Sequence, residues 1–307
     1  MSNIYITFAT NRTIKMLSIL IPTYNYDCLE LVEELHHQAQ TLLFPIEILV
    51  ADDGSKEELK RNNRKINKLS NCMFIELKEN VGRARIRNFL SEKAKYDILL
   101  FIDSDAGLVS NDFLQNYVSA MQNSEVICGG LLYDRPLPSP VFSLRYYYGI
   151  CAEERSAKER NLCPYAQFSS FSFLIRKKTF REILFDESFS GYGHEDTAFG
   201  IELEKREIKV RHIDNPLYHL GLEKNEDFLY KTETGIETLY RFSDKLTKYV
   251  RLLQAYNKVR KYKLQKPVAF LFRKTHGLLK KNILSLHPNM KVFAFYKLGY
   301  LCNIKSN

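Results

Sequence analysis

Short apolar runs rich in branched side chains alternate with segments of helical periodicity over the first two-thirds of the chain. The runs predict buried strands at residues 17–22, 46–51, 73–77, 97–102, 125–132, 171–176 and 208–213. Between them, the spacing of apolar residues predicts helices at residues 27–40, 55–69, 82–94, 111–122, 177–184 and 196–206. This alternation predicts an α/β fold with a mostly parallel central sheet and helices on both faces.

The remaining segments carry weaker signals. Residues 134–167 contain three closely spaced prolines and are expected to be irregular, as a binding loop or lid would be. A glycine-rich turn is expected at residues 189–195, with the side chain of Asp196 capping the helix that follows. Residues 226–262 have a helical pattern, and residues 266–307 mix apolar and basic positions. The character of the chain is therefore expected to change near residue 225.

Composition is typical of a globular protein, but charge is distributed unevenly. Hydrophobic residues make up 45% of the 307 residues. The six cysteines form no CxxC pair, which argues against a zinc knuckle or a disulfide framework and favours a reducing, cytoplasmic location. All 36 Asp and Glu residues lie at or before Asp244, whereas residues 245–307 carry 15 Lys and Arg. The C-terminal region is therefore strongly basic.

Acidic residues directly follow two of the predicted strands. Asp52 and Asp53 end one strand, and Asp103-Ser104-Asp105 follows another. In sheets of this kind, ligands bind at the carboxyl ends of the strands. A D-x-D turn there suits Mg²⁺ or Mn²⁺, which can bridge a diphosphate, and a carboxylate can accept a hydrogen bond from a base or a ribose. For each cluster the alternative is an ordinary turn with solvated acids or a helix cap.

Three further groups of polar residues have chemistry suited to a site. Glu195 or Asp196 could serve as a general base, although Asp at this position is also a common helix cap. His219 is an even choice between a third metal ligand and a structural histidine. A strand-to-helix junction that suits phosphate, or else forms an ordinary basic helix face, contains Asn80, Gly82, Arg85, Arg87 and Asn88.

Signatures of several other protein classes are missing from the sequence. There is no GxGxxG, GxxxxGK[ST], HExxH or GxSxG, which argues against dehydrogenases, P-loop kinases, zincins and α/β-hydrolases. A nucleotidyltransferase would typically carry a glycine-rich basic loop where this chain has Pro22-Thr23-Tyr24-Asn25. A nucleic-acid-binding role would leave both acidic clusters unexplained, so no nucleic-acid partner is expected.

The order and spacing of five motifs resemble the family 2 glycosyltransferases, which have the GT-A fold. The motifs are residues 18–25 (SILIPTYN), 48–55 (ILVADDGS), 80–88 (NVGRARIRN), 103–105 (DSD), and 185–189 (FDESF) followed by 192–196 (YGHED). They cover about residues 17–221. The resemblance implies a GT-A catalytic domain over residues 16–225, an N-terminal extension over residues 1–15 and a helical basic region over residues 226–307.

The resemblance also implies roles for particular residues. Asp196 would be the catalytic base with Glu195 beside it, and Asp105, Asp103 and His219 would bind Mn²⁺ or Mg²⁺. The nucleotide would be bound by Pro22, Tyr24, Asn25, Asp52, Asp53, Asn80, Gly82, Arg85, Asp103 and Ser104. The implied reaction is an inverting, metal-dependent transfer of a hexose or N-acetylhexosamine from a nucleotide-diphosphate sugar, with a UDP-sugar favoured. The acceptor would be a hydroxyl of a glycan or lipid-linked glycan, as in polysaccharide biosynthesis of the cell envelope.

Departures from the family pattern refine this expectation. Processive synthases of the family carry a QxxRW motif and membrane spans, whereas this chain has no Trp and no apolar run of about 18 residues. We therefore expect the addition of a single sugar. Residues 168–172 replace a Gly-Asn-type segment, and His194 stands where small residues are common, so both are expected to affect the acceptor. The alternative is a non-catalytic nucleotide-sugar-binding protein, against which the intact acids at 103, 105 and 196 argue.

The basic C-terminal region permits two interpretations. Apolar residues are interleaved with its bases, among them Phe270, Leu271, Phe272, Leu278 and Phe293. Such a pattern suits the surface of an anionic bilayer, which would place the enzyme peripherally on the inner face of the membrane. Equally, the apolar residues could pack on the catalytic domain or on a partner chain.

Overall fold

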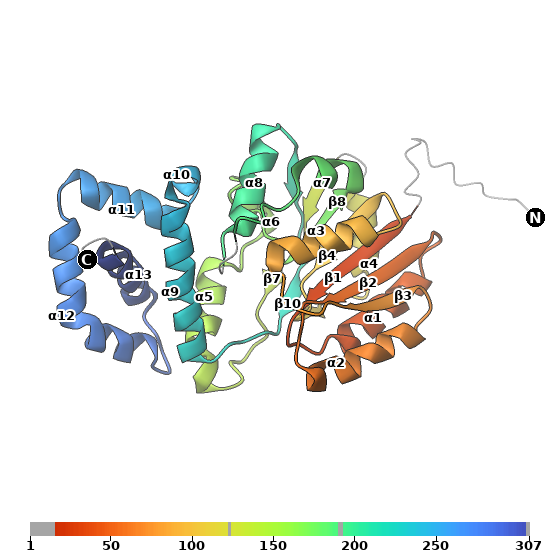
Figure 1. Cartoon of the computed structure of the whole chain (residues 1–307), viewed down its shortest axis with the longest axis horizontal. Helices are drawn as coiled ribbons and strands as arrows, with labels where there is room; N and C mark the ends of the chain where they lie inside the picture. Colours follow the sequence, from red (N-terminus) through yellow and green to blue (C-terminus); the bar gives the residue numbers. More distant parts are fainter. Residues whose placement is uncertain (1–15, 122–123, 190–192, 305–307) are drawn as a thin grey trace, which may run out of the picture.

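A computed structural model of the chain describes residues 16–121, 124–189 and 193–304 (Figure 1). The predicted fold class is confirmed: a mixed, mostly parallel sheet is flanked by helices, and helices follow it towards the C-terminus. The extension predicted at residues 1–15 lies outside the described residues, as does Tyr192 of the last motif.

A seven-stranded sheet in the order β3-β2-β1-β4-β8-β6-β9 forms the centre of the α/β half. Its strands are β1 (Leu17–Thr23), β2 (Ile46–Asp52), β3 (Cys72–Glu76), β4 (Ile98–Ile102), β6 (Val126–Cys128), β8 (Ser172–Arg176) and β9 (Val210–His212). Strand β8 is antiparallel to β4 and β6, and the other neighbouring pairs are parallel. Because β1, β2 and β4 are parallel neighbours, the acids that follow β2 and β4 reach the same edge of the sheet.

Helices cover both faces of this sheet because its central strands are apolar on both sides. In β1, Ile19 and Ile21 belong to one hydrophobic cluster with Leu35 of α1, whereas Leu20 belongs to the other with Leu90 of α3. The helical elements of this half are α1 (Leu29–Gln40), α2 (Glu57–Asn63), η1 (Arg64–Lys68), α3 (Arg83–Lys93), α4 (Phe113–Ala120), α7 (Lys177–Ile183) and α8 (Glu195–Lys205).

A second, three-stranded sheet corrects the prediction of one strand at residues 125–132. After β6 the chain turns at Gly129 and Gly130 and enters β7 (Leu131–Leu132), which pairs with β10 (Leu217–His219). Gly130 has φ 95°, and a Cβ on Gly129 would lie 2.5 Å from the hydroxyl of Tyr117, so both positions require glycine. Strand β10 also pairs with β5 (Ala106–Leu108) and places His219 opposite Ala106, next to the D-x-D turn.

Two local predictions in the middle of the chain were wrong. Residues 134–167 are not irregular throughout, since they contain η3 (Pro140–Phe142), α5 (Ser143–Ala152) and α6 (Ala157–Arg160). Helix α5 is stabilised by tertiary contacts, which cannot be predicted from its own sequence. Leu144 is buried beside Phe228, and the N–H of Leu144 donates to Asn225 Oδ1 at 2.8 Å. Asp196 does not cap α8, because the helix starts one residue earlier and the Asp196 carboxylate accepts from the N–H of Thr197.

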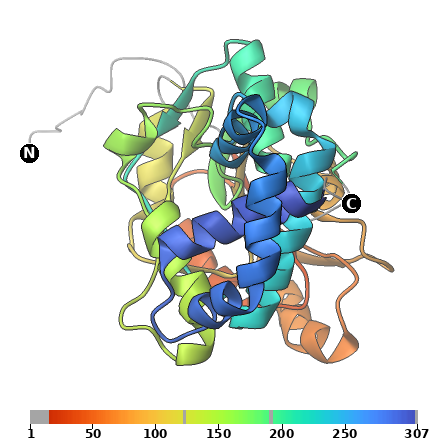
Figure 2. The same ribbon diagram turned by 90° about the vertical axis from the view of Figure 1, so that its left-hand side faces the viewer.

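Up to Ile304, where the description ends, the C-terminal region consists of the helices α9 (Asn225–Arg241), α10 (Ser243–Leu246), α11 (Arg251–Lys261), α12 (Gln265–Ile283) and α13 (Met290–Ile304). Helix α9 lies beside α5, and α13 packs between α9 and α12 (Figures 1 and 2). Short breaks interrupt the helix predicted at residues 226–262. Within the described ranges, no helix is both long and apolar enough to cross a membrane.

Candidate active site

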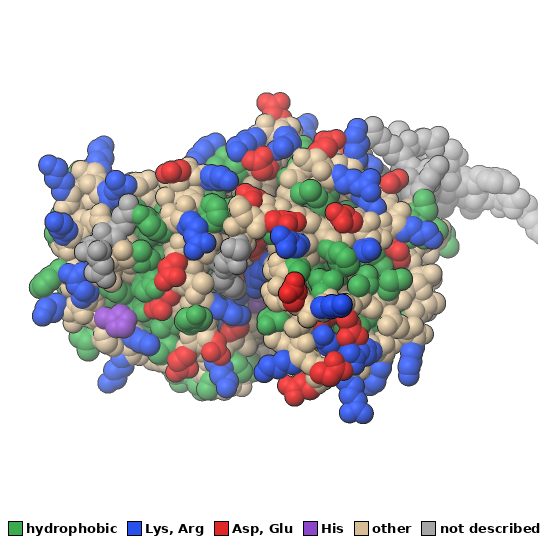
Figure 3. All heavy atoms as spheres, viewed as in Figure 1, with side chains coloured by type: hydrophobic (Ala, Val, Ile, Leu, Met, Phe, Trp, Pro, Cys, Tyr) green, Lys and Arg blue, Asp and Glu red, His purple; other side chains and the backbone are tan. Residues whose placement is uncertain are grey.

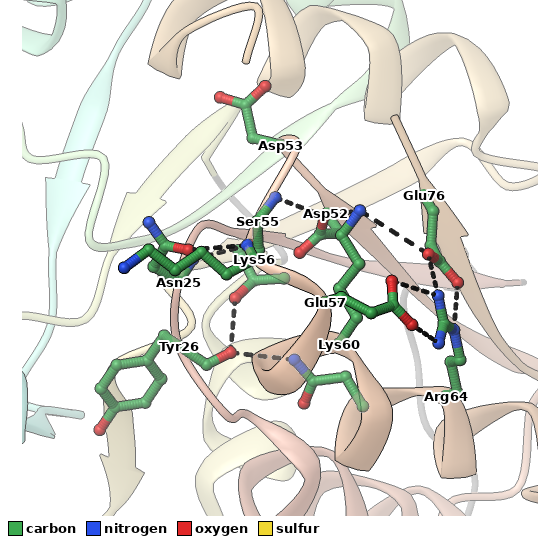
Figure 4. A network of polar contacts seen from close by, with 12 residues as sticks. Asn25, Tyr26, Asp52, Asp53, Ser55, Lys56, Glu57, Lys60, Arg64 and Glu76 are labelled. Carbon is green, nitrogen blue, oxygen red and sulfur yellow. Dashed lines mark hydrogen bonds and ion pairs between the residues drawn. The ribbon is translucent and has the colours of Figure 1, made fainter. Parts of the chain in front are cut away.

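Asp52 ends β2 in a network of polar contacts at the sheet edge (Figure 4). Its side chain is buried, and Oδ1 accepts from the N–H of Ser55 at 2.9 Å and lies 3.6 Å from Nζ of Lys60. Oδ2 is buried too, but has no hydrogen-bond partner among the described residues. Since an unpaired buried carboxylate oxygen is unfavourable, this atom is an acceptor that suits an N–H or O–H group of a ligand.

Asp53 points away from Asp52, towards α3 (Figure 4). Its two oxygens accept from the N–H groups of Val81 and Gly82, at 2.7 and 3.1 Å. Burial raises the pKa of this carboxyl, and the two backbone hydrogen bonds oppose the rise. Gly82 has φ 89° and is the residue before α3, and Asn80, two positions earlier, is exposed. Asp53 therefore holds the turn that leads into α3.

The loop after β1 completes the rim around Asp52. Asn25 has φ 51°; its N–H donates to Ser55 Oγ at 2.7 Å and its side chain accepts from the N–H of Lys56 at 3.0 Å. Tyr24 is 53% exposed, and Pro22 pairs with Ala51 inside the sheet. An exposed aromatic residue thus directly follows Thr23, which pairs with Asp52 in the sheet.

A cleft of about 430 Å³ gathers the predicted catalytic and metal-binding residues. Its walls contain Asp103, Asp105, Glu195, Asp196 and His219, which come from the end of β4, the start of α8 and β10. Ser104 between the two aspartates is buried and is not part of the wall. Residues more than a hundred positions apart in the sequence are therefore brought to one surface.

Arg87 connects the D-x-D turn to the start of α8. Its buried guanidinium donates to Asp103 at 2.6 Å and lies 4.0 Å from Glu195. Burial raises the pKa of Asp103, and the charge of Arg87 opposes the rise. Of the neighbouring arginines, Arg83 lines the cleft, whereas Arg85 pairs with Glu187 at 2.9 Å. Of these two arginines, Arg83 is thus the one that faces the cleft.

Asp196 has the electrostatic environment of a proton acceptor. Burial in the cleft and the adjacent carboxylate of Glu195 raise the pKa of Asp196 to about 6. A general base works best when its pKa lies close to the working pH, because it is then both deprotonated and sufficiently basic. This carboxylate can therefore accept a proton near neutral pH.

Asp105 and His219 fit one end of a divalent-cation site. Their Oδ2 and Nε2 atoms are 3.7 Å apart, and the imidazole lies between the rings of Tyr133 and Phe171, which fix its plane. A Cβ on Gly221 would lie 2.1 Å from Oδ2 of Asp105, so only glycine leaves the carboxylate in place. A carboxylate with an imidazole suits Mn²⁺ better than Mg²⁺.

Asp103, the third predicted metal ligand, forms a hydrogen bond with Arg87. The described part of the chain contains no group of three His, Cys, Asp or Glu residues arranged to hold a metal. Two side chains are thus in place, and further ligands would have to come from a bound substrate or water.

Arg145 and Glu153 are cleft residues that the sequence did not reveal. The guanidinium of Arg145 donates to both carboxylate oxygens of Glu153 at 3.1 and 3.0 Å, and lies 3.2 Å from Nε2 of His219. Tyr133 donates to the same carboxylate at 2.5 Å. Burial would raise the pKa of Glu153, but Arg145 and Tyr133 hold it below its ordinary value. Both residues belong to the segment expected to be a loop, which explains why they were missed.

Comparisons with known proteins agree with this architecture. The family model described as glycosyl transferase family 2 matches residues 18–184, more than half of the chain. An uncharacterized glycosyltransferase of Haemophilus influenzae is 25% identical over 260 residues, which cover 81% of this chain and 98% of that protein. The chondroitin synthase of Escherichia coli is 26% identical over 238 residues, covering 66% of this chain. The match spans only 34% of that synthase.

Two solved structures share the fold at low sequence identity. The mannosyltransferase PcManGT of Pyrobaculum calidifontis, solved in complex with GDP-Man and Mn²⁺, has a TM-score of 0.59 and 13% identity. The match covers 95% of this chain and 87% of that one. S. aureus TarS 1–349, solved in complex with UDP-GlcNAc, has a TM-score of 0.50 and 17% identity, over 95% and 91% of the two chains. At these identities the likeness shows the fold alone.

Proposed function

The chain belongs to glycosyl transferase family 2, and from this premise we propose that it transfers a single sugar from a nucleotide-diphosphate sugar to a hydroxyl of a glycan or lipid-linked glycan. The observation that carries the proposal is the cleft itself. Asp105 and His219 lie at one place on its wall and suit a cation and a diphosphate, while Asp196 provides a base in the same cleft. The donor would thus be activated at Asp105 and His219, and the acceptor at Asp196.

The nucleotide would lie along the sheet edge, with its base at Asp52. The free Oδ2 of Asp52 would accept a hydrogen bond from the base, and the exposed ring of Tyr24 would stack beside it. Pro22, Asn25, Asp53, Asn80, Gly82 and Ser104 shape this edge. Among donors we favour a UDP-sugar, a choice supported by the UDP-GlcNAc complex of a protein with the same fold.

The transfer itself would be a single in-line displacement with inversion. As the acceptor oxygen forms its bond to the anomeric carbon, Asp196 takes the hydroxyl proton. The bond from that carbon to the diphosphate breaks, and its electron pair leaves with the nucleoside diphosphate. Glu195 would stay beneath Asp196, towards Arg87, and keep the start of α8 aligned with the D-x-D turn.

Asp105 and His219, with Asp103 nearby, would hold a Mn²⁺ or Mg²⁺ ion, which when bound neutralises charge on the departing diphosphate. Metal dependence is supported by the fold relative solved with Mn²⁺. Arg83 would add a positive charge on the same wall.

We also propose how the chain is organised and where it works. A catalytic domain over residues 16–225 would be followed by a basic helical region over residues 226–307, and the start of α9 at Asn225 supports this division. All six cysteines are free, which suits a reducing, cytoplasmic location. A lipid-linked acceptor would bring such an enzyme to the inner face of the membrane.

Isothermal calorimetry with UDP-, GDP- and dTDP-sugars, with and without Mn²⁺, tests the donor assignment. We expect one nucleotide class to bind in a Mn²⁺-dependent manner and this dependence to be lost in Asp105→Ala. Asp112→Ala, which changes an exposed aspartate outside the cleft, is the matched control and should bind as the wild type does. Failure of every donor to bind the wild type would refute the proposal.

A further inference from the structure

The C-terminal helices divide their apolar residues into an inner and an outer set. Phe272, Ile283, Phe293 and Tyr296 are buried together with Leu144 and Phe228, so they fasten this region to α5 and α9. For this inner set, packing of the apolar residues on the chain itself is the interpretation that applies. It leaves the outer set without a role in folding.

The outer set lies on α12. Phe270, Leu271 and Leu278 are 57%, 50% and 73% exposed, although they are large apolar side chains in a well-formed helix. Their spacing places them on one face, and Lys266, Lys274 and Lys281 are exposed at the intervening turns of the same face. We call these six residues the α12 outer face.

The charged side chains of the last three helices have a single sign. No Asp or Glu occurs after Asp244, so α11, α12 and α13 carry bases only. The acids of the C-terminal region lie on α9 and α10: Glu233 and Glu237 accept hydrogen bonds from Tyr296 and Tyr300 of α13, and Glu226, Asp227 and Glu237 are exposed. Figure 3 shows Lys and Arg side chains around this end, with hydrophobic side chains between them.

We propose that the α12 outer face docks on an anionic lipid bilayer. Apolar side chains between lysines match a bilayer surface, because the apolar groups enter the acyl boundary while the lysines extend to the phosphates. A nucleic acid would pair with the lysines but leave Leu271 and Leu278 in water. An acidic protein partner would be expected to bind in a groove of this chain. The α12 outer face is instead the surface of one helix at the end of the molecule (Figures 1 and 2).

Docking at α12 is compatible with catalysis in the cleft. Helix α12 lies at the end of the molecule remote from the sheet, with α9 and α13 between it and α5 (Figure 1). A bilayer at this end leaves the cleft between the sheet and α5 uncovered. The proposal rests on the proposed function only in that docking would deliver a lipid-linked acceptor. Membrane binding itself can be measured without any donor.

Vesicle flotation of the full chain tests the proposal. Vesicles of equal parts phosphatidylglycerol and phosphatidylcholine should carry the protein upward at low salt, and vesicles of phosphatidylcholine alone should not. In Lys266→Glu/Lys274→Glu/Lys281→Glu the partition coefficient should fall by at least about 100-fold, since each base near an anionic surface contributes roughly a factor of five. Phe270→Ser/Leu271→Ser/Leu278→Ser should also detach the protein.

Matched controls change the same residue types elsewhere on the surface. Lys65→Glu/Lys68→Glu/Lys178→Glu and Leu43→Ser/Met73→Ser/Leu162→Ser alter exposed residues of the α/β half and should float as the wild type does. All four variants should keep the wild-type melting temperature and donor binding, which separates failure of membrane docking from failure of the proposed function. The proposal is overturned if the wild type does not float, if both α12 variants still float, or if the α12 variants abolish self-association or RNA binding instead.

Discussion

The α/β half and the C-terminal helices place their functional side chains in opposite ways. In the α/β half, acids stand at strand ends and point into a cleft, where Asp103 and Asp105 follow β4 directly. In the C-terminal region most Lys and Arg side chains are exposed, and one connection to the cleft runs through α5. Arg145 of α5 lies 5.2 Å from the ring of Phe228 on α9 and 3.2 Å from His219. Chemistry thus belongs to the sheet edge, and the helices act through α5 or through their outer surface.

The largest effect should come from the base in the α/β half. Asp196→Asn keeps the shape of the side chain but cannot take the acceptor proton, so nucleotide release from the donor should fall by about 10²–10⁴-fold. Donor affinity should change little, since the donor would contact the D-x-D turn and Asp52. Stopped or discontinuous assays of nucleotide release, with Asp112→Asn as control, measure this. Activity within a few-fold of the wild type would exclude Asp196 as the base.

The next largest effect should come from the cation site. Asp105→Ala removes a ligand while leaving Asp196 untouched, so both Mn²⁺ affinity and nucleotide release should fall, the latter by about 100-fold or more. Titration of Mn²⁺ followed by electron paramagnetic resonance checks the binding directly. Unchanged Mn²⁺ affinity would show that the D-x-D turn is not the metal site.

A smaller effect on stability and Mn²⁺ affinity is expected where the two regions meet, at Arg145 of α5. Arg145→Gln leaves the carboxylate of Glu153 without its cation and frees Nε2 of His219, so we expect a loss of about 1–3 kcal/mol in stability. Mn²⁺ affinity should shift as well, because His219 loses a neighbour that fixes it. Thermal melts and the same Mn²⁺ titration measure both changes. Arg135→Gln, which breaks the exposed pair with Glu154, is the control and should alter neither.

The smallest effect concerns pH. Because the pKa of Asp196 is raised to about 6, the base is ionised above this pH and protonated below it. Nucleotide release should be flat near neutrality and fall about tenfold for each pH unit below the pKa. Folding stability changes with pH in the opposite direction, because ionised Asp196 supports activity but lowers stability. A raised carboxyl pKa makes ionisation in the folded state unfavourable, so Asp196→Asn should melt later than the wild type above pH 6 and equally below pH 4. A pH profile that is unchanged in Asp196→Asn would assign the titration to another group.

The two regions also differ in what sequence could predict. Strand ends such as Asp52 and Asp103 were predictable because each acid follows a buried apolar run, and their places in the cleft and rim follow from the parallel order of β1, β2 and β4. Arg145 and Glu153 were not predictable, because α5 is held by Asn225 and Phe228, about eighty residues away. The division of the C-terminal apolar residues into inner and outer sets likewise depends on packing that periodicity alone does not contain.

One assay tests the central claim most directly. The wild-type protein is incubated with UDP-, GDP- and dTDP-sugars, with Mn²⁺ or with a chelator, and release of free nucleotide by slow hydrolysis is followed. We expect release from one nucleotide class only, dependent on Mn²⁺, lost in both Asp105→Ala and Asp196→Asn and retained in the α12 variants. Release that persists at the wild-type rate in Asp105→Ala and Asp196→Asn would contradict the assignment of the cleft as the site of glycosyl transfer.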